Sequence, residues 1–226
     1  RDEIAEAAPR LAEHIKSSAK FVKVATMACT LLEEGRVNMY NSEAFFAVLE
    51  AGVADTKRIR NKEMRSAYRR LYSAALQRKD AFHTKRQAQL RLWHMHVINQ
   101  IDLFSKHADQ FARIAKEIRH GLLLLPCVTP SLEPPTRSGV PREHLPPQAR
   151  RVWADALFDC LEVGMLHHKQ PWATSELFML VKTAYDRRQN FTDSQTGSVR
   201  EWERMRMESS RAQRKESERT DTSKRE

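Results

Sequence analysis

Residues 57–91 read KRIRNKEMRSAYRRLYSAALQRKDAFHTKRQAQLR, and we call them the basic stretch. The stretch contains twelve cations: Lys57, Arg58, Arg60, Lys62, Arg65, Arg69, Arg70, Arg78, Lys79, Lys85, Arg86 and Arg91. Only two acidic residues, Glu63 and Asp80, oppose them, so the net charge of the stretch is +10, equal to that of the whole 226-residue chain. The positive charge of this protein is therefore concentrated in about one sixth of its length.

Helical periodicity places several of these basic residues on one side of a helix. On one helix, the spacing of 4, 3 and 4 between Arg58, Lys62, Arg65 and Arg69 forms a single stripe. The apolar residues form a second stripe on roughly the opposite side: Met64, Ala67, Tyr68, Leu71, Ala74 and Ala75. The pattern predicts a helix that buries one face and presents a row of cations on the other.

A row of cations suits the phosphates of nucleic acid, because each neutralised phosphate releases a condensed counterion. Arginine adds a planar fork that can donate two hydrogen bonds to one phosphate. We therefore predict that all twelve cations of the basic stretch contact RNA. Tyr72 lies near the stripe and is predicted to stack on unpaired bases, whereas Tyr68 and Trp93 fit apolar positions and are expected in the core.

Composition favours an all-α fold, either an irregular helical array or a stack of helical hairpins. Only six glycines occur, while Ala, Arg, Glu, Leu and Lys are abundant, so tight turns between strands are not expected. The isoelectric point near 9.8 fits a nucleic-acid-binding protein, and it also fits an acidic protein partner or an anionic membrane surface.

The predicted organisation begins with a basic helical body over residues 1–125. Residues 1–35 read as helical, with Gly35 as a left-handed cap, and a second helix ends near Gly52. This hairpin resembles those of the tetratricopeptide and pentatricopeptide repeat families. Their signature residues are absent, and no period of 33–36 residues follows later in the chain.

The second half of the chain changes character. Seven of the nine prolines lie between Gly121 and Pro147, which predicts an extended linker over residues 126–147. A helical hairpin with an aromatic core is predicted over 148–191. Residues 192–226 form a long charged helical tail, which we expect to be disordered in isolation because it offers little apolar surface to bury.

Catalytic chemistry has no support in the sequence. No HExxH, GxxxxGK[ST], GxGxxG or GxSxG motif occurs, so no catalytic residue, metal ligand or cofactor is predicted. Three widely spaced cysteines favour a reducing compartment over a disulfide framework. No run approaches the ~20 apolar residues of a membrane-spanning helix.

These observations predict a non-catalytic structural or accessory subunit of a large ribonucleoprotein. The mixture of basic helices, a proline-rich segment and a charged tail resembles subunits of mitochondrial ribosomes, which implies rRNA-like RNA, neighbouring proteins as partners and the mitochondrial matrix. A first residue other than Met would suit an imported protein whose presequence has been removed. The alternative is a scaffold subunit of a protein-only assembly, in an organellar membrane complex or the cytoskeleton. There the basic face would dock on acidic helices or anionic lipid.

Overall fold

The fold is all-α, as the sequence predicts. The computed structural model describes residues 2–133 and 143–223, and all regular secondary structure in these two ranges is helical. Two compact units divide the chain, unit 1 (Arg1–Lys106) and unit 2 (His107–Glu226). The division falls earlier than the predicted boundary at residue 125, because the helix that follows Lys106 packs on helices of the second half.

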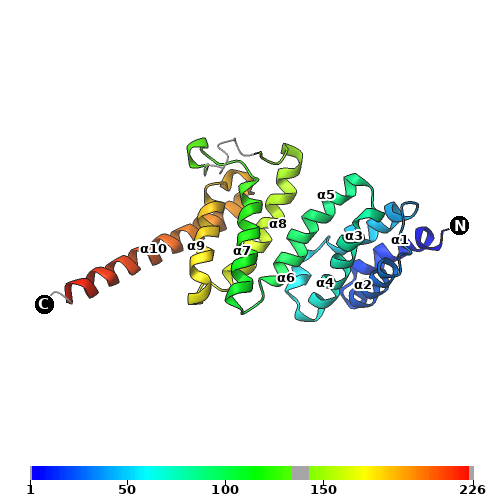
Figure 1. The fold of residues 1–226 in the computed structure, drawn as a ribbon, viewed down its shortest axis with the longest axis horizontal. Coiled ribbons are helices and arrows are strands. Elements are labelled where there is room, and N and C mark those ends of the chain that lie inside the picture. The colour runs from blue at the N-terminus through cyan, green and yellow to red at the C-terminus, as the bar shows by residue number, and fades with distance from the viewer. Residues whose placement is uncertain (1, 134–142, 224–226) are drawn as a thin grey trace. The chain divides into compact units, whose positions relative to one another are not determined.

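In unit 1, the closest packing is between helices that are next but one along the chain. Figure 1 shows α1, α3 and α5 in one row, with α2 and α4 beside them. The closest packing joins α1 to α3 and α2 to α4. The elements are α1 (Glu3–Lys16), α2 (Ser18–Glu33), α3 (Ser42–Gly52), η1 (Thr56–Arg60), α4 (Lys62–Gln77), η2 (Lys79–Ala81), α5 (Thr84–Trp93), η3 (His94–Asn99) and α6 (Gln100–Asp102).

Local sequence explains the ends of the first helices. The helix predicted over residues 1–35 is divided at Ser17, whose extended backbone separates α1 from α2. Asp2 caps α1 by accepting from the backbone N–H groups of Ile4 and Ala5. Gly35 has a φ of 71° and ends α2, which confirms the predicted left-handed cap.

Aromatic rings fill the core of unit 1. Phe21 of α2 stacks on Tyr68 of α4 with ring centroids 4.1 Å apart, and Phe46 of α3 stacks on Trp93 of α5 at 4.8 Å. Tyr72 meets the edge of Trp93 at 5.7 Å. The core positions predicted for Tyr68 and Trp93 are confirmed, because both rings are buried.

The last helix of unit 1 contains a π-helical segment, η3, between α5 and α6. Three polar residues at the end of this segment and just after it are buried: Asn99, Gln100 and Asp102. The Asn99 amide contacts the sulfur of Met95 at 3.4 Å, and Asp102 pairs with Arg69 of α4. The π-segment therefore turns a polar edge of the helix towards the interior of the unit.

In unit 2, too, alternate helices along the chain pack on one another. α7 packs on α9, and Phe111 meets Trp172 edge to face at 5.4 Å. Phe158 of α8 stacks on Trp202 of α10 at 5.5 Å. The elements are α7 (Ala108–Leu123), η4 (Pro130–Leu132), α8 (Pro147–Met165), α9 (Pro171–Tyr185), η5 (Arg188–Asn190) and α10 (Asp193–Ser223).

The described parts of the proline-rich segment are attached to unit 2 rather than forming a free linker. The Pro126 carbonyl accepts a hydrogen bond of 2.9 Å from the Asn190 amide. The Leu145 N–H donates to the Leu124 carbonyl at 2.9 Å. Residues 134–142 of the predicted linker lie outside the described residues.

A buried arginine reinforces this attachment. The side chain of Arg187, at the end of α9, is only 1% exposed and donates to the Glu133 carboxylate at 2.8 Å. Glu133 also accepts from the Cys127 backbone N–H and lies 3.2 Å from His144 Nε2. One carboxylate thus connects both flanks of the proline-rich segment to α9.

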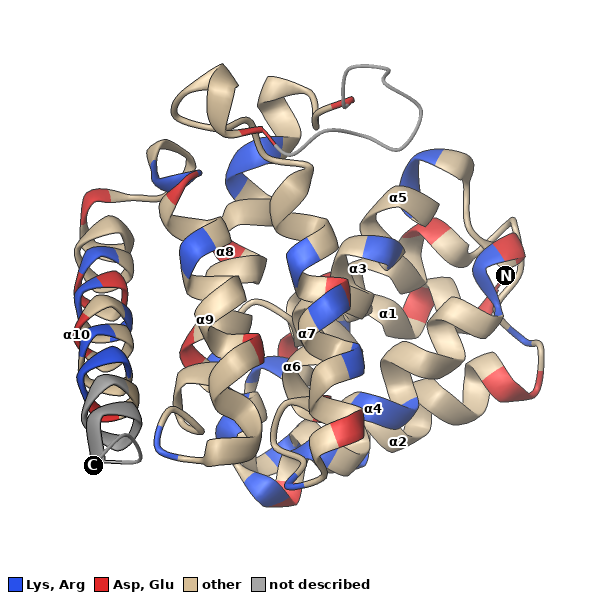
Figure 2. Cartoon of the chain, turned by 60° about the vertical axis from the view of Figure 1, so that its left-hand side comes forward, with Lys and Arg blue, Asp and Glu red and all other residues tan. Residues whose placement is uncertain are grey.

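The charged tail forms α10, which begins at Asp193, at the start of the predicted segment 192–226. Its first half packs on unit 2 through Val199 and Trp202, whereas residues 211–217 are exposed on all sides. Bands of basic and acidic residues alternate along it in Figure 2. Within the described ranges, no helix combines the length and the apolar character needed to cross a membrane.

Candidate nucleic-acid interface

The basic stretch does not form one continuous helix. It covers η1, α4, η2 and α5, and Asn61 separates η1 from α4 by capping the second helix through the Glu63 N–H. Arg58 therefore precedes α4 and does not continue the stripe of Lys62, Arg65 and Arg69. The predicted uninterrupted row of cations from residue 58 to 69 is wrong for this reason.

Arg58 points into unit 1 and binds backbone carbonyls. Its Nη1 donates to the carbonyl oxygens of Ile15 and Lys16 at 3.0 and 3.1 Å, and its Nη2 donates to that of Gly52 at 3.1 Å. These carbonyls end α1 and α3, where the last turns lack helical partners. The guanidinium also lies 4.8 Å from the Phe21 ring centroid. Arg58 is thus a structural cation that joins two helix ends.

Arg65 is occupied in a similar way. Its Nε and Nη2 donate to the carbonyls of Ile59 and Arg60 at 3.1 and 2.9 Å, and its Cζ lies 3.5 Å from the centroid of the Phe104 ring. Burial lowers the pKa of this guanidinium from its usual value. Two carbonyls and a ring hold this side chain against unit 1, so it is less free than a solvated arginine to turn towards a phosphate.

Three further arginines pair with acids of unit 1. Arg69 pairs with the buried Asp102 and Arg86 with Glu43, so both charges are compensated within the fold. Arg86 also covers the Phe46 ring at 4.4 Å. Arg70 lies 3.6 Å from Glu33 in a pair that is about half exposed on both sides. Of these three arginines, Arg70 has the least confined guanidinium.

The prediction that Tyr72 stacks on bases is incompatible with its position. Its ring is 1% exposed, and its hydroxyl donates to the Leu49 carbonyl. Burial raises the pKa of this phenol well above its usual value. Tyr72 occupies a helical position that borders both stripes, and the close approach of α3 and α5 assigns it to the core.

The remaining cations gather at the two ends of α4. Lys57, Arg60 and Lys62 are exposed at its start, and Arg78, Lys79 and Lys85 are exposed around its end. Arg91 is exposed separately on α5. Sixteen residues separate the two groups along α4, which corresponds to about 24 Å at the rise of an α-helix. No ion pair within the described ranges involves Lys57, Lys62, Lys79 or Lys85.

We call the group at the start of α4 the proximal cluster: Lys57, Arg60, Lys62 and the exposed Lys20 of α2. Lys20 belongs here because the neighbouring Phe21 ring lies against Arg58. A shallow groove between α2 and α4 begins beside this cluster, and its α4 side is lined by Ser66 together with Glu63 and Arg70. Hydroxyls beside lysines are common phosphate-contacting groups.

The group at the end of α4 is the distal cluster of Arg78, Lys79 and Lys85. Acidic residues lie beside both clusters, with Asp55 and Glu63 at the proximal one. Asp80 follows Lys79 directly in the chain. The Arg78 guanidinium lies beside Gly35, which follows the C-terminal end of α2. A Cβ atom placed on this glycine would be only 3.3 Å from Arg78 Nη2. Glu34 is the neighbour of that glycine. With four cations against three, the proximal cluster is the more positive of the two.

Sequence reasoning overlooked an exposed pair of large side chains, Met39 and Tyr40, in the loop between α2 and α3. They are 76% and 89% exposed, respectively. The loop is ordered by its asparagines, because Asn38 accepts from the Tyr40 N–H and Asn41 accepts from the Asn38 N–H, both at 2.9 Å. The sequence feature that could have revealed this ordered loop is the placing of Asn38 and Asn41 on either side of two large residues that fit no helical pattern.

The described residues contain no group of three or more His, Cys, Asp or Glu side chains that could hold a metal ion. No known protein family, curated protein or solved structure matches the chain. The physical properties of its surfaces therefore carry the functional argument.

Proposed function

We propose that this protein is a non-catalytic subunit of a large ribonucleoprotein and holds RNA phosphates with the proximal cluster. The observation that carries the proposal is the exposed, uncompensated charge of Lys57 and Lys62 on either side of the α4 cap, with Lys20 beside them. The distal cluster supplies a second and weaker contact. An RNA-rich, reducing compartment such as the mitochondrial matrix suits a chain with three free cysteines.

The mode of binding follows from which cations remain exposed. Lysine is a compact charge on a flexible stem, and five of the seven cations in the two clusters are lysines: Lys20, Lys57, Lys62, Lys79 and Lys85. Such contacts neutralise phosphates without reading bases. We therefore expect binding with little sequence preference and a strong dependence on salt.

The test is RNA binding by the whole chain across a salt series, with a variant in which Lys57, Lys62, Lys79 and Lys85 are changed to Glu. For single-stranded RNA, every lysine that no longer neutralises a phosphate should reduce the slope of log K against log salt by about 0.7. The variant should bind weakly, and its slope should be smaller by up to about 3.

A matched control reverses four exposed charges elsewhere, at Arg10, Lys106, Lys116 and Lys169. It has the same net charge as the first variant and should keep most of the affinity and the slope. Equal reductions in the two variants would show that net charge alone drives binding. Absence of binding by the unaltered chain at low salt would contradict the RNA proposal.

A second candidate function is that of a scaffold subunit in a protein-only assembly, and the ordered loop with Met39 and Tyr40 favours it. Tyrosine and methionine are enriched in the buried centres of protein interfaces, and an ordered loop loses little entropy on docking. In that case the basic clusters would meet acidic helices or anionic lipid. Association that ignores added RNA but is abolished in Tyr40→Ser would support this function.

A further inference from the structure

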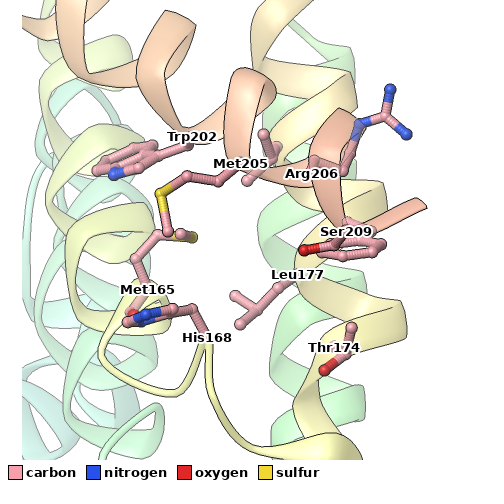
Figure 3. Close-up of a pocket in the computed structure, with 10 residues that line it drawn as sticks. Met165, His168, Thr174, Leu177, Trp202, Met205, Arg206 and Ser209 are labelled. Atoms are coloured by element: carbon pink, nitrogen blue, oxygen red, sulfur yellow. The ribbon is translucent and has the colours of Figure 1, made fainter. Parts of the chain in front are cut away.

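A pocket in unit 2 brings together two methionines, a histidine and a tryptophan from separate segments. It lies between the end of α8, α9 and α10, has a cavity volume of about 40 Å³, and opens to solvent. Figure 3 shows the side chains of Met165 and Met205 meeting beside the Trp202 ring, with His168 below Met165. Leu177 and Phe178 of α9 supply an apolar wall.

The hydrogen bonding of His168 leaves a nitrogen lone pair available. Its Nδ1 lies 2.9 Å from the Met165 carbonyl oxygen, which can only accept, so the proton of the neutral ring is on Nδ1. Nε2 then carries the lone pair. Histidines that ligate metals usually donate their other ring N–H in this way, often to a backbone carbonyl.

Trp202 contributes an aromatic wall that is held in place. Its ring stacks on Phe158 with centroids 5.5 Å apart and also lines the pocket. Indole attracts a cation within about 6 Å of its ring more strongly than the other aromatic side chains do. A positive ion between the two sulfurs would lie beside this ring.

The chemistry of the lining selects the kind of ion. No carboxylate and no thiol lines the pocket, so hard cations such as Mg²⁺ and Ca²⁺ have no suitable ligands. Thioethers are soft ligands that favour monovalent copper, and imidazole also binds copper. The one cationic residue of the lining, Arg206, is compensated by Glu203 at 2.7 Å, and in Figure 3 its guanidinium points away from the pocket.

We propose that this pocket binds one Cu(I) ion through the sulfurs of Met165 and Met205 and Nε2 of His168, with Trp202 beside the ion. All three ligands are neutral, so one positive charge remains for the indole to attract. Met165 ends α8 and Met205 belongs to α10, so a bound ion connects the two helices. The proposal is independent of RNA binding, because it uses no residue of the basic stretch.

The test is titration of the whole chain with Cu(I) under anaerobic, reducing conditions against a chromophoric Cu(I) chelator. All proteins carry Cys127→Ser, because Cys127 is the one cysteine that is not buried and a thiol would compete for the ion. One equivalent should bind. The pocket variant Met165→Leu/Met205→Leu should bind at least about 100-fold more weakly, since removal of a supporting residue alone costs 10- to 100-fold.

Leucine nearly conserves the volume of methionine, so the pocket variant should keep the unfolding temperature of the metal-free chain. The matched control is Met27→Leu/Met207→Leu, which removes two exposed sulfurs outside the pocket and should bind as tightly as its parent. X-ray absorption of the complex should show two sulfurs and one nitrogen around copper. Failure to bind one equivalent, or equal affinity in both double variants, would overturn the proposal.

Discussion

Arginines in this protein have two different uses, and the composition of the stretch cannot separate them. Arg58 and Arg65 satisfy backbone carbonyls, whereas Lys57 and Lys62, their close neighbours in the chain, point into solvent. The difference follows from where helices end, because unsatisfied carbonyls gather there and a guanidinium has five donors in a planar fork. Charge in the basic stretch therefore serves partly the fold and partly the surface.

Arg58→Met should destabilise unit 1 by about 3 kcal/mol, because hydrogen bonds from a charged donor contribute 1.5–3 kcal/mol and three carbonyls would be left without their donor. The apolar stem of methionine still covers Phe21. The measurement is the free energy of unfolding in urea. Lys57→Met is the matched control and should change it by less than about 0.5 kcal/mol; similar destabilisation in both would refute the structural role of Arg58.

Glu133→Gln should destabilise unit 2 by about 3 kcal/mol, because it leaves the Arg187 guanidinium, which is 1% exposed, without a charged partner. Thermal unfolding provides the measurement. The exposed Glu143, on the other flank of the proline-rich segment, gives a control in Glu143→Gln, which should have little effect. An unchanged unfolding temperature in Glu133→Gln would mean that the ion pair does not hold the segment.

At the scale of elements, α10 shows how one helix can be stabilised in two ways. Its first half buries Val199 and stacks Trp202, so tertiary packing fixes it. Further along, Arg204 lies between Glu201 and Glu208, one turn away on either side. Beyond Ser210 the described side chains are exposed. Ion pairs on a surface contribute little, so the second half depends on helix propensity and local charge.

Amide hydrogen exchange should therefore divide α10 near Ser210. Backbone N–H groups of residues 199–206 should be protected by the packing of Trp202, and those of 211–217 should exchange faster by orders of magnitude, because their exposed side chains bury little surface. Trp202→Ala should reduce protection in the first half and leave the second half unchanged. Uniform protection along the helix in the isolated chain would contradict this division.

At the scale of the whole molecule, periodicity predicts the all-α class, the cap at Gly35 and the core positions of Tyr68 and Trp93. It cannot predict which cations remain exposed, because Arg58 binds the carbonyls of Ile15 and Lys16 and Arg69 binds Asp102, all more than 30 residues away in the chain. The stripe pattern also assigns Tyr72 to the surface wrongly, because the residues that bury its ring come from other, distant helices. The boundary after Lys106 depends on packing between α7 and α9, which no local pattern contains.

The proposed copper site is beyond sequence reasoning as well. Met165 and Met205 are forty residues apart, and methionines at helical positions usually indicate ordinary core packing. In the sequence, His168 stands out only as the neighbour of His167. Met165, His168 and Met205 line one pocket only because α10 packs beside the end of α8, which is a property of the tertiary fold.

The π-helical segment η3 sets the phase of everything that follows it in unit 1. Its i→i+5 hydrogen bonds accommodate one residue more per turn than an α-helix does, so η3 acts as a built-in insertion. If this segment adopted α-helical geometry with the same number of residues, α6 would rotate by about 100°. Asp102 would then turn away from Arg69, so the backbone geometry of this segment is fixed as tightly as its composition.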